Sequence, residues 1–236
     1  MENVANSQFE SLALPSESEI QILKDDCLLV KKWRWDYQEC LRFQKRAQEL
    51  VRANRRLKIY IFCNHPHCFT LGRGNERGRE DLTDFDPSSS FELKFPLHKV
   101  HRGGGITFHY PGQWIFYPIV SIGPSYTLED HMCWLLKSVA NVLKERFGLL
   151  DVVAAKKLMG VWKDKKKLAS IGVGVARFVT EHGLALNLAH DQLMFEELAK
   201  INPCGMTSEK YASVDSFAQA PQLLELFHKQ YLQSLK

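Results

Sequence analysis

The alternation of hydrophobic and polar residues predicts strands and helices in mixed order along this chain of 236 residues. Between residues 36 and 55, the apolar residues Cys40, Phe43 and Ala47 recur every three to four positions, which is the period of a helix with one buried face. Basic residues close the last turn of that segment, as expected at the carboxyl end of a helix. Runs rich in β-branched and aromatic residues are typical of strands, and they occupy residues 27–35, 58–63, 105–110, 114–122 and 181–189.

Capping and turn residues mark several boundaries in the second half of the chain. Thr127 and Asp130 match a capping box at the start of a long helix, and Gly148 is a natural stop for it. A further β region at 160–178 contains the pair Asp164-Lys165, which marks a hairpin turn. The hairpin signals favour antiparallel pairing between neighbouring strands.

The remaining segments are predicted as a loop, two closing helices and an extension. Residues 73–95 are polar and rich in Gly, Pro and Ser, which predicts a long loop. The segments 191–200 and 221–235 are predicted as closing helices, with Pro221 at the first helical position of the last one. Residues 1–20 are polar and are predicted as a flexible N-terminal extension. Strand hairpins mixed with helices then favour an α+β fold on a mostly antiparallel sheet.

Composition narrows the class of protein without identifying it. Residues 21–236 are long enough for one domain with a substantial core. The 45% hydrophobic and 25% charged residues are ordinary for a globular protein, and a net charge of +4 is too small to argue for nucleic acid. No apolar run reaches membrane-spanning length, and no secretory signal is visible. The six cysteines include no C-x-x-C pair, which predicts free thiols in a reducing cytoplasm.

One cysteine stands where it could act as a nucleophile. Cys204 lies between Pro203 and Gly205, so the thiol sits on a stiff turn with little neighbouring side-chain bulk. A thiol needs a nearby base or positive charge to ionise near neutral pH. Because single cysteines are more often packed in cores than reactive, the structural interpretation stays open beside the catalytic one.

Two other residues have both a site interpretation and a structural one. Lys167 ends a lysine-rich turn and leads directly into the apolar run LASIGVGV. A lysine at a strand start can direct its ammonium into a cleft, or it can extend along the surface. His182, beside Gly183 in EHGLALNL, is either a core histidine with a satisfied partner or part of a site.

Two motifs contain residue types that bind ligands elsewhere. Three successive glycines follow Arg102, and they either let backbone approach a neighbour closely or form a tight bulge between strands. That motif lacks the features of a P-loop or of a dinucleotide fingerprint. The segment CNHPHC at 63–68 has two Cys and two His, but its spacing is wrong for a zinc ribbon or finger. We therefore expect a strand end that turns at Pro66 and no metal site.

Five motifs occur together and in one order: HPHCFTLGR, RGGGITFHYPGQ, GVWKDKKKLASIG, HGLALN and NPCG. The set resembles the lipoyl(octanoyl) transferases, the acyltransferases of lipoate synthesis in the biotin/lipoate protein ligase superfamily. The resemblance covers roughly residues 28–235. It implies a single α+β domain with a mixed, largely antiparallel sheet flanked by helices, a monomer, and a reaction without a cofactor.

The resemblance also assigns roles to individual residues. Cys204 matches the nucleophile of the family's PCG motif. Lys167 matches the lysine that serves as acid and base and lowers the pKa of that thiol. The acyl-binding residues implied in the same way are Arg102, Gly103, Gly104, Gly105, Ile106, Thr107, Phe108, His109, Ser170, Ile171, Gly172, His182, Gly183, Leu184 and Ala185.

The chain departs from the family pattern near the expected pocket. Tyr110 stands where the family usually has glycine, and Gly105 stands where a polar residue is common. The segment before GVW lacks the Arg and Pro that often precede it. These departures bear on acyl length and partner preference rather than on the type of reaction.

The implied reaction has two halves. In the first, Cys204 attacks an octanoyl thioester on acyl carrier protein, with Lys167 as the base, and an acyl-enzyme forms. In the second, a lysine ε-amine on a lipoyl domain of a 2-oxoacid dehydrogenase, or on the H protein of glycine cleavage, attacks the acyl-enzyme. A thioester is already activated toward amines, which agrees with the lack of a P-loop.

Two other hypotheses remain. An ATP-dependent lipoate or biotin ligase of the same superfamily would use an acyl-adenylate and would need no nucleophilic cysteine. A non-catalytic module that binds lipoyl domains or carrier proteins would never become acylated. The presence of both Cys204 and Lys167 favours the transferase, with protein partners and neither nucleic acid nor membrane.

Overall fold

An eight-stranded sheet forms the centre of the molecule. The structure is a computed structural model, and it describes residues 9, 12–24, 26–74, 93–201 and 206–235. The strand order is β1-β2-β3-β7-β11-β10-β9-β8. Within this described sheet, β2 and β3 pair in parallel and every other neighbouring pair is antiparallel, which confirms the predicted α+β class and its mixed, largely antiparallel sheet. The strands are β1 (Glu19–Lys24), β2 (Cys27–Lys32), β3 (Lys58–Cys63), β7 (Gln113–Ile119), β8 (Val153–Ala155), β9 (Gly160–Lys163), β10 (Lys166–Ala176) and β11 (Val179–Asn187).

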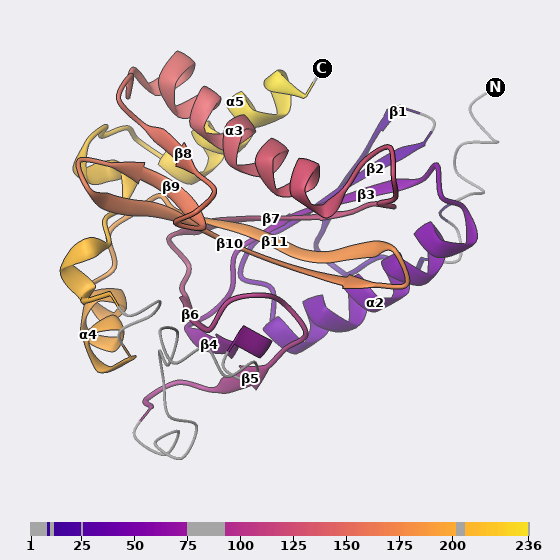
Figure 1. Cartoon of the computed structure of the whole chain (residues 1–236), viewed down its shortest axis with the longest axis horizontal. Coiled ribbons are helices and arrows are strands. Elements are labelled where there is room, and N and C mark those ends of the chain that lie inside the picture. The colour runs from indigo at the N-terminus through magenta and orange to yellow at the C-terminus, as the bar shows by residue number, and fades with distance from the viewer. Residues whose placement is uncertain (1–8, 10–11, 25, 75–92, 202–205, 236) are drawn as a thin grey trace.

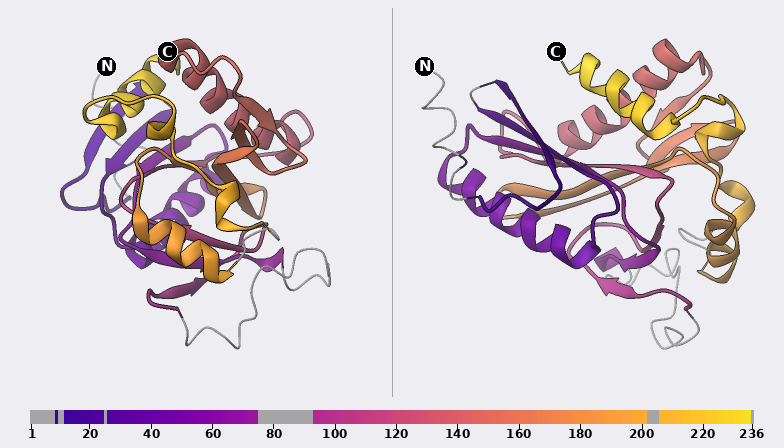
Figure 2. Two further views of the ribbon diagram at one scale, coloured as in Figure 1. Left: turned by 90° about the vertical axis from the view of Figure 1, so that its left-hand side faces the viewer. Right: turned by 180° about the vertical axis from the view of Figure 1, so that it is seen from behind.

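Helices cover both faces of this sheet. Figure 1 shows α3 and α5 on one face and α2 on the other, and Figure 2 shows the same layers from two further directions. A smaller sheet of order β5-β4-β6 lies on the same side as α2. These elements are α2 (Tyr37–Ala53), α3 (Leu128–Phe147), α4 (Gln192–Ile201), α5 (Leu223–Ser234), β4 (Cys68–Leu71), β5 (Leu97–Lys99), β6 (Ile106–His109), and the short 3-10 helices η5 (Ser208–Lys210) and η6 (Val214–Ser216).

The central strands have an apolar core on each face. Phe62 of β3 and Phe116 of β7 belong to the core beneath α3 and α5, whereas Ile61 and Ile115 belong to the core beneath α2. Successive side chains of a strand point to opposite faces, so a strand covered on both sides needs apolar residues at every position. All seven residues of β7 are buried accordingly. Burial of one large apolar side chain contributes roughly 1.5–3 kcal/mol, so these two cores dominate the stability of the sheet.

The capping and turn predictions for residues 127–165 are confirmed. The Thr127 hydroxyl accepts the Asp130 N–H at 3.2 Å, and the Asp130 carboxylate accepts the Thr127 N–H at 2.9 Å. Gly148 ends α3 with a φ of 69°, a left-handed conformation that glycine adopts without strain. Asp164 and Lys165 have φ values of 47° and 62°, as a two-residue type I′ hairpin requires.

Three features of the chain differ from the sequence-based prediction. Pro221 is not the first residue of α5, because Gln222 takes a left-handed φ of 49° and the helix starts after it. The strand β1 begins at Glu19, inside the predicted extension, because it pairs with the outer edge of β2. Phe9 and Leu12 are also buried against the α2 core, so the described part of that extension contacts the domain.

Three short strands were not predicted from the sequence. The prediction did not resolve β4, β5 or β8, which have only three or four residues each. Of the predicted loop, residues 75–92 lie outside the described residues. In the described chain, Cys40, Cys63, Cys68 and Cys133 are free thiols.

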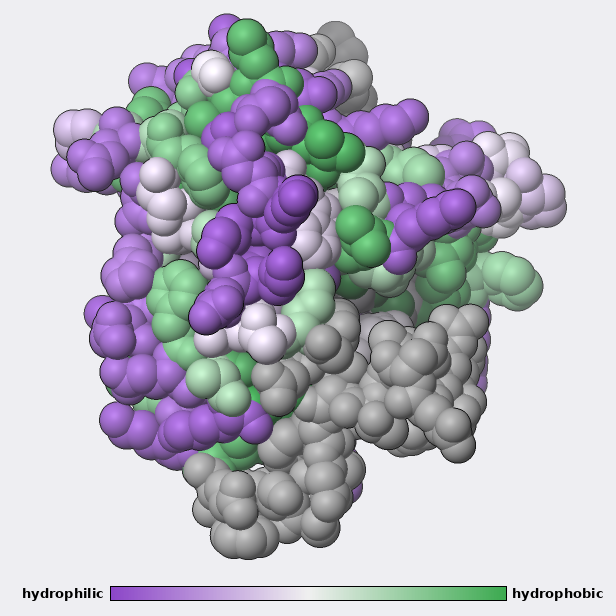
Figure 3. All heavy atoms as spheres, turned by 60° about the vertical axis from the view of Figure 1, so that its left-hand side comes forward, coloured by the Kyte–Doolittle hydropathy of each residue, from purple (hydrophilic) through white to green (hydrophobic). Residues whose placement is uncertain are grey.

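The surface mixes residue types. On the face in Figure 3, hydrophilic residues cover much of the molecule and hydrophobic residues form smaller groups between them. No helix in the described ranges combines the length and the apolar character needed to cross a membrane.

Candidate active site

Lys167 points into the protein rather than along its surface. It lies on β10 where the register with β9 shifts between Lys167 and Ala169. Such a bulge re-aims a side chain at a sheet position. The Lys167 residue is 2% exposed, and its ammonium nitrogen lies 5.6 Å from the centre of the Trp162 ring. A cation above an aromatic face is stabilised electrostatically, so Trp162 helps to hold this ammonium inside.

Gly160 leaves the space that Lys167 needs. A Cβ atom on Gly160 would lie 2.3 Å from the Ala169 carbonyl oxygen and 2.7 Å from Cε of Lys167. On its other side, Lys167 forms a bridge to Tyr211, and its carbonyl accepts the Ala212 N–H at 3.2 Å. The segment after residue 205 therefore runs directly beside Lys167.

Two adjoining chambers open next to this lysine. The larger, of about 210 Å³, is called the proximal chamber and contains Lys167 in its wall. The smaller, of about 30 Å³, is called the distal chamber and shares Arg102, Thr107, Ser170 and Ile171 with the first. The other residues of the proximal chamber are Gly104, Gly105, Ile106, Phe108, Gln113, Met159, Asn187, Met194, Leu198 and Tyr211. Those of the distal chamber are Tyr37, His109, Tyr117, Gly172, His182, Gly183, Leu184 and Ala185.

The structure thus brings the predicted acyl-binding residues together. With the exception of Gly103, each of them lines at least one of the two chambers. Gly103 secures the loop instead, since its N–H donates to the Val173 carbonyl at 3.1 Å. Cys204, the predicted nucleophile, lies outside the described residues.

The Arg102 guanidinium holds the glycine segment in place. One nitrogen donates to the carbonyls of Gly103 and Gly105 at 3.0 and 3.1 Å. The other donates to the Thr70 carbonyl and hydroxyl at 2.9 and 2.7 Å and to the Thr107 hydroxyl at 2.9 Å. Buried charges require such partners, and these five oxygens are neutral groups.

The close approach expected of the glycines is made to the protein's own backbone. Gly104 has a φ of 78°, and its carbonyl accepts the Gly74 N–H at 3.0 Å. A Cβ on Gly174 of β10 would lie 2.0 Å from the His101 carbonyl oxygen. The glycine segment therefore packs closely against β10 and against the residues that follow β4.

A chain of buried polar side chains links the two chambers. The Thr70 hydroxyl donates to Nε2 of His109 at 3.2 Å, and Nδ1 of His109 donates to Gln113 Oε1 at 2.9 Å. The Gln113 amide donates to Asn187 at 3.0 Å, and the Asn187 amide donates to the Ala212 carbonyl at 3.2 Å. Burial holds the pKa of His109 well below its usual value, so the ring is neutral and fits these roles.

Apart from the Arg102 guanidinium, the distal chamber is lined by groups that are uncharged near neutral pH. Burial, with a smaller contribution from Arg102, lowers the pKa of His182 to about 3. Burial raises the pKa of Tyr37 and that of Tyr117 above the ordinary value for a phenol. At about 30 Å³ this chamber is too small for an acyl chain. The proximal chamber, with apolar residues such as Phe108 and Leu198 in its wall, is the one that suits an uncharged aliphatic chain.

Sequence reasoning missed several chamber residues. Gln113 and Asn187 stand inside quoted motifs, and a polar residue next to an apolar run was an available signal. Tyr37, Met194 and Tyr211 come from α2, α4 and the end of η5, and nothing in the local sequence links them to the site. Their contribution is visible only in the folded chain.

Tyr110 does not line either chamber. It is fully buried beside α4, and its hydroxyl donates to the Ala189 carbonyl at 3.1 Å. Its ring also fills the space next to Gly112, where a Cβ would lie 2.7 Å away. Tyr110, which stands where the family usually has glycine, thus affects the packing of the turn at Gly112 and not the wall of either chamber.

Comparison with known proteins agrees with this geometry. Residues 36–236 match the lipoyl protein ligase A/B catalytic domain. An octanoyltransferase from Nostoc sp. is 30% identical over 194 residues, which cover 81% of this chain and 82% of the relative. An octanoyltransferase from Desulforamulus reducens is 32% identical over 203 residues, which cover 84% of each chain. These relatives bear out the acyltransferase class predicted from the motifs.

Solved structures share the fold. A lipoate-protein ligase A bound with ATP superimposes with a TM-score of 0.64 at 15% identity, covering 89% of this chain and 83% of that one. A putative lipoate protein ligase from T. acidophilum with bound lipoic acid gives 0.61 at 15% identity, covering 88% and 83%. Identities this low show the fold alone. Together with the family match, the comparisons show that the chain belongs to the lipoyl protein ligase A/B catalytic-domain family.

Proposed function

We propose that this chain transfers an octanoyl or lipoyl group from a carrier-protein thioester to a lysine of a lipoyl domain, through an acyl-Cys204 intermediate. The observation that carries the proposal is the buried Lys167 side chain in the wall of a chamber of about 210 Å³ that also contains apolar residues such as Phe108 and Leu198. It occurs in a chain about one-third identical to proteins named octanoyltransferase.

The two residues divide the chemistry. In its neutral amine form, Lys167 accepts the thiol proton of Cys204, the sulfur attacks the thioester carbon, and the carrier thiol leaves with the proton that Lys167 returns. In the second half, an acceptor lysine amine attacks the acyl-enzyme and gives a proton to Lys167, and the sulfur leaves and is reprotonated. Acid and base assistance of this kind is typically worth ~10²–10⁴ in rate.

The neighbours of residues 202–205 support a partnership between Cys204 and Lys167. Ile201, which precedes them, and Met206, which follows, belong to the same apolar cluster as Tyr211. Tyr211 in turn bridges to Lys167. Ile201 and Met206, the described residues on either side of Cys204, thus belong to a cluster whose members Met194, Leu198 and Tyr211 line the proximal chamber.

The partners follow from the same proposal. The donor is octanoyl-acyl carrier protein, and the acceptors are lipoyl domains of 2-oxoacid dehydrogenases and the H protein of glycine cleavage. Lys165 and Lys166 are exposed on the hairpin next to Lys167, where they suit an acidic protein partner. The protein would act as a monomer in the cytoplasm.

Intact mass spectrometry tests the acyl-enzyme directly. The protein is mixed with octanoyl-acyl carrier protein without ATP, and the adduct is mapped by peptide analysis. We expect a hydroxylamine-labile octanoyl adduct on Cys204 that Cys204→Ala abolishes and that the matched control Cys133→Ala retains. Full transfer by Cys204→Ala would refute the mechanism, and a strict need for ATP would identify an adenylate-forming ligase instead.

A further inference from the structure

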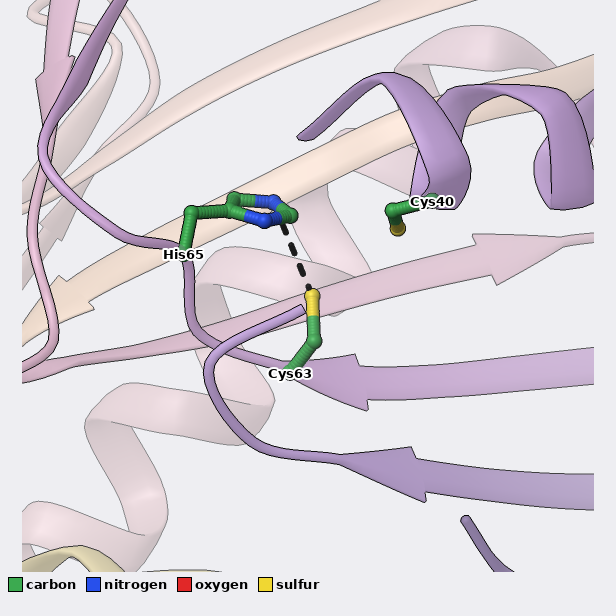
Figure 4. Close-up of side chains that lie close together, drawn as sticks. All are labelled: Cys40, Cys63 and His65. Carbon is green, nitrogen blue, oxygen red and sulfur yellow. Dashed lines mark hydrogen bonds between the residues drawn. The ribbon is translucent and has the colours of Figure 1, made fainter. Parts of the chain in front are cut away.

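Three metal-ligating side chains meet in the core beneath α2, away from Lys167. Cys40 comes from α2, Cys63 ends β3, and His65 follows in the loop to β4 (Figure 4). One ligand atom from each lies within 4.8 Å of the other two, and all three residues are fully buried. Within the described ranges, no other group of three Cys, His or acidic residues meets this distance.

The orientation of His65 is that of a metal ligand. Its Nδ1 lies 2.7 Å from the Trp35 carbonyl oxygen, and a carbonyl can only accept, so Nδ1 carries the hydrogen. The lone pair is therefore on Nε2, which lies 3.8 Å from Sγ of Cys63. Metal-bound histidines typically donate their other ring nitrogen to a carbonyl or carboxylate in this way, because that bond fixes the tautomer and the ring direction.

The donor set selects the ion. We propose that Cys40, Cys63 and His65 form a binding site for Zn²⁺. Two thiolates and one imidazole are typical zinc ligands, and two thiolate charges balance a divalent ion in a buried setting where net charge is costly. On binding, two Zn–S bonds form and the two thiol protons pass to solvent. The Tyr117 hydroxyl oxygen lies 3.3 Å from Nε2 of His65 and is a candidate for a fourth position.

The site differs from the one that the CNHPHC segment suggests. His67 of that segment lies 3.0 Å from the Asp191 carboxylate, well away from the cluster, and Cys68 belongs to strand β4. Cys40 replaces them as the third ligand, from a helix more than twenty residues earlier in the sequence. Local spacing therefore could not indicate this site, and only the packing of α2 on β3 assembles it.

The cluster adjoins the distal chamber without being part of it. The ring of Tyr37 lies 4.9 Å from that of His65, and Tyr37 also lines the chamber. The Gln44 side-chain amide donates from Nε2 to Sγ of Cys40 at 3.8 Å, and its Oε1 accepts the backbone N–H of His182 at 2.8 Å. A bound ion would therefore brace the helix against the chamber wall, and the proposal stands independently of the catalytic one.

Cobalt titration tests the site in the full-length protein. Metal-free protein is titrated with Co²⁺ under reducing, oxygen-free conditions, and the thiolate-to-cobalt charge-transfer band is followed before competition with Zn²⁺. We expect the wild type to bind about one equivalent and Zn²⁺ to displace it. Cys40→Ala and Cys63→Ala should each lose at least about tenfold in affinity, because loss of an outer-shell partner of a metal ligand already costs that much elsewhere. Cys68→Ala, a buried cysteine outside the cluster, is the matched control and should bind like the wild type, as should Cys204→Ala.

Contrary results are equally clear. Absence of the charge-transfer band in the wild type, or unchanged affinity in Cys40→Ala, would overturn the proposal. Loss of binding in Cys68→Ala with retention in Cys40→Ala would assign the metal to the CNHPHC segment instead. If the two ligand variants fail to fold, the thermal midpoint of the wild type and of Cys68→Ala decides the question, because Zn²⁺ should raise both. A Cys40–Cys63 disulfide in peptide maps, with no metal uptake by the reduced protein, would also refute a zinc site.

Discussion

Gly160→Ala should disable the site through a single methyl group. The new Cβ would lie 2.3 Å from the Ala169 carbonyl oxygen, whereas such contacts are essentially never below 3.0 Å. The β9 and β10 backbones must therefore separate by at least about 0.7 Å at this point. Because the same Cβ would meet Cε of Lys167 at 2.7 Å, the lysine must move as well.

The size of the effect follows from that displacement. A misplacement of a catalytic group by about 1 Å can cost ~10²-fold in rate, so we expect a loss of this order in octanoyl transfer. The strain should also lower the free energy of unfolding by about 1–3 kcal/mol, as overpacking does elsewhere. The assay is the initial rate of transfer to a lipoyl domain, together with the rate of acyl-enzyme formation by intact mass and a thermal unfolding curve.

Gly123→Ala provides the matched control. A Cβ at Gly123 meets nothing within 4 Å, and this glycine has no positive φ. We expect its activity and thermal midpoint to equal those of the wild type. Wild-type activity in Gly160→Ala, beside an unaffected control, would refute the argument that the β9–β10 spacing positions Lys167 for the reaction.

Three further outcomes test other parts of the molecule. Arg102→Lys keeps the charge but cannot reproduce the forked donors of the guanidinium, so buried carbonyls lose their partners. Calorimetry should show that the free energy of unfolding falls by about 1–3 kcal/mol for each carbonyl left without a partner, and acyl-enzyme formation should slow. An unaltered unfolding profile in Arg102→Lys would contradict the bonding described for the chamber. Tyr110→Phe removes one hydrogen bond outside the chambers, so chemical denaturation should show that the free energy of unfolding falls by about 1 kcal/mol while transfer activity is retained. A changed acyl-length preference in this variant would show that Tyr110 does contribute to the pocket. Burial lowers the pKa of His131 to about 4, so the unfolded state binds the proton first and stability should fall as pH drops from about 6.5 to 4. In His131→Leu this acid limb should be shallower by roughly 2–3 kcal/mol, and a limb as steep as that of the wild type would contradict the burial argument.

Most helices and long strands of this fold could be predicted from local pattern. The spacing of Cys40, Phe43 and Ala47 determined which face of α2 is buried, because a helix repeats every 3.6 residues regardless of its partner. Thr127 and Gly148 determined the ends of α3 for a similar reason, since caps satisfy backbone groups within a few residues. By contrast, local pattern did not reveal the edge strands β1 and β8, and each is held by pairing with the next strand along the chain.

Only part of the candidate site could be predicted from the sequence. The motifs around Lys167 and the three glycines identified chamber residues, because each motif keeps its members close along one strand or loop. They could not show that the Arg102 guanidinium would hold the glycine segment, nor that Tyr211 would lie beside Lys167. Those contacts join residues from distant segments.

The amino-acid sequence by itself thus determined the local elements, the family motifs and the residue types available for acyl transfer. Tertiary structure alone decided which of them meet. Cys63 and His65 acquired Cys40 as a third neighbour, rather than His67 or Cys68, because α2 lies across the end of β3. Contacts of this kind form when apolar faces of distant segments bury one another. The local sequence of each segment does not indicate which other segment it will meet.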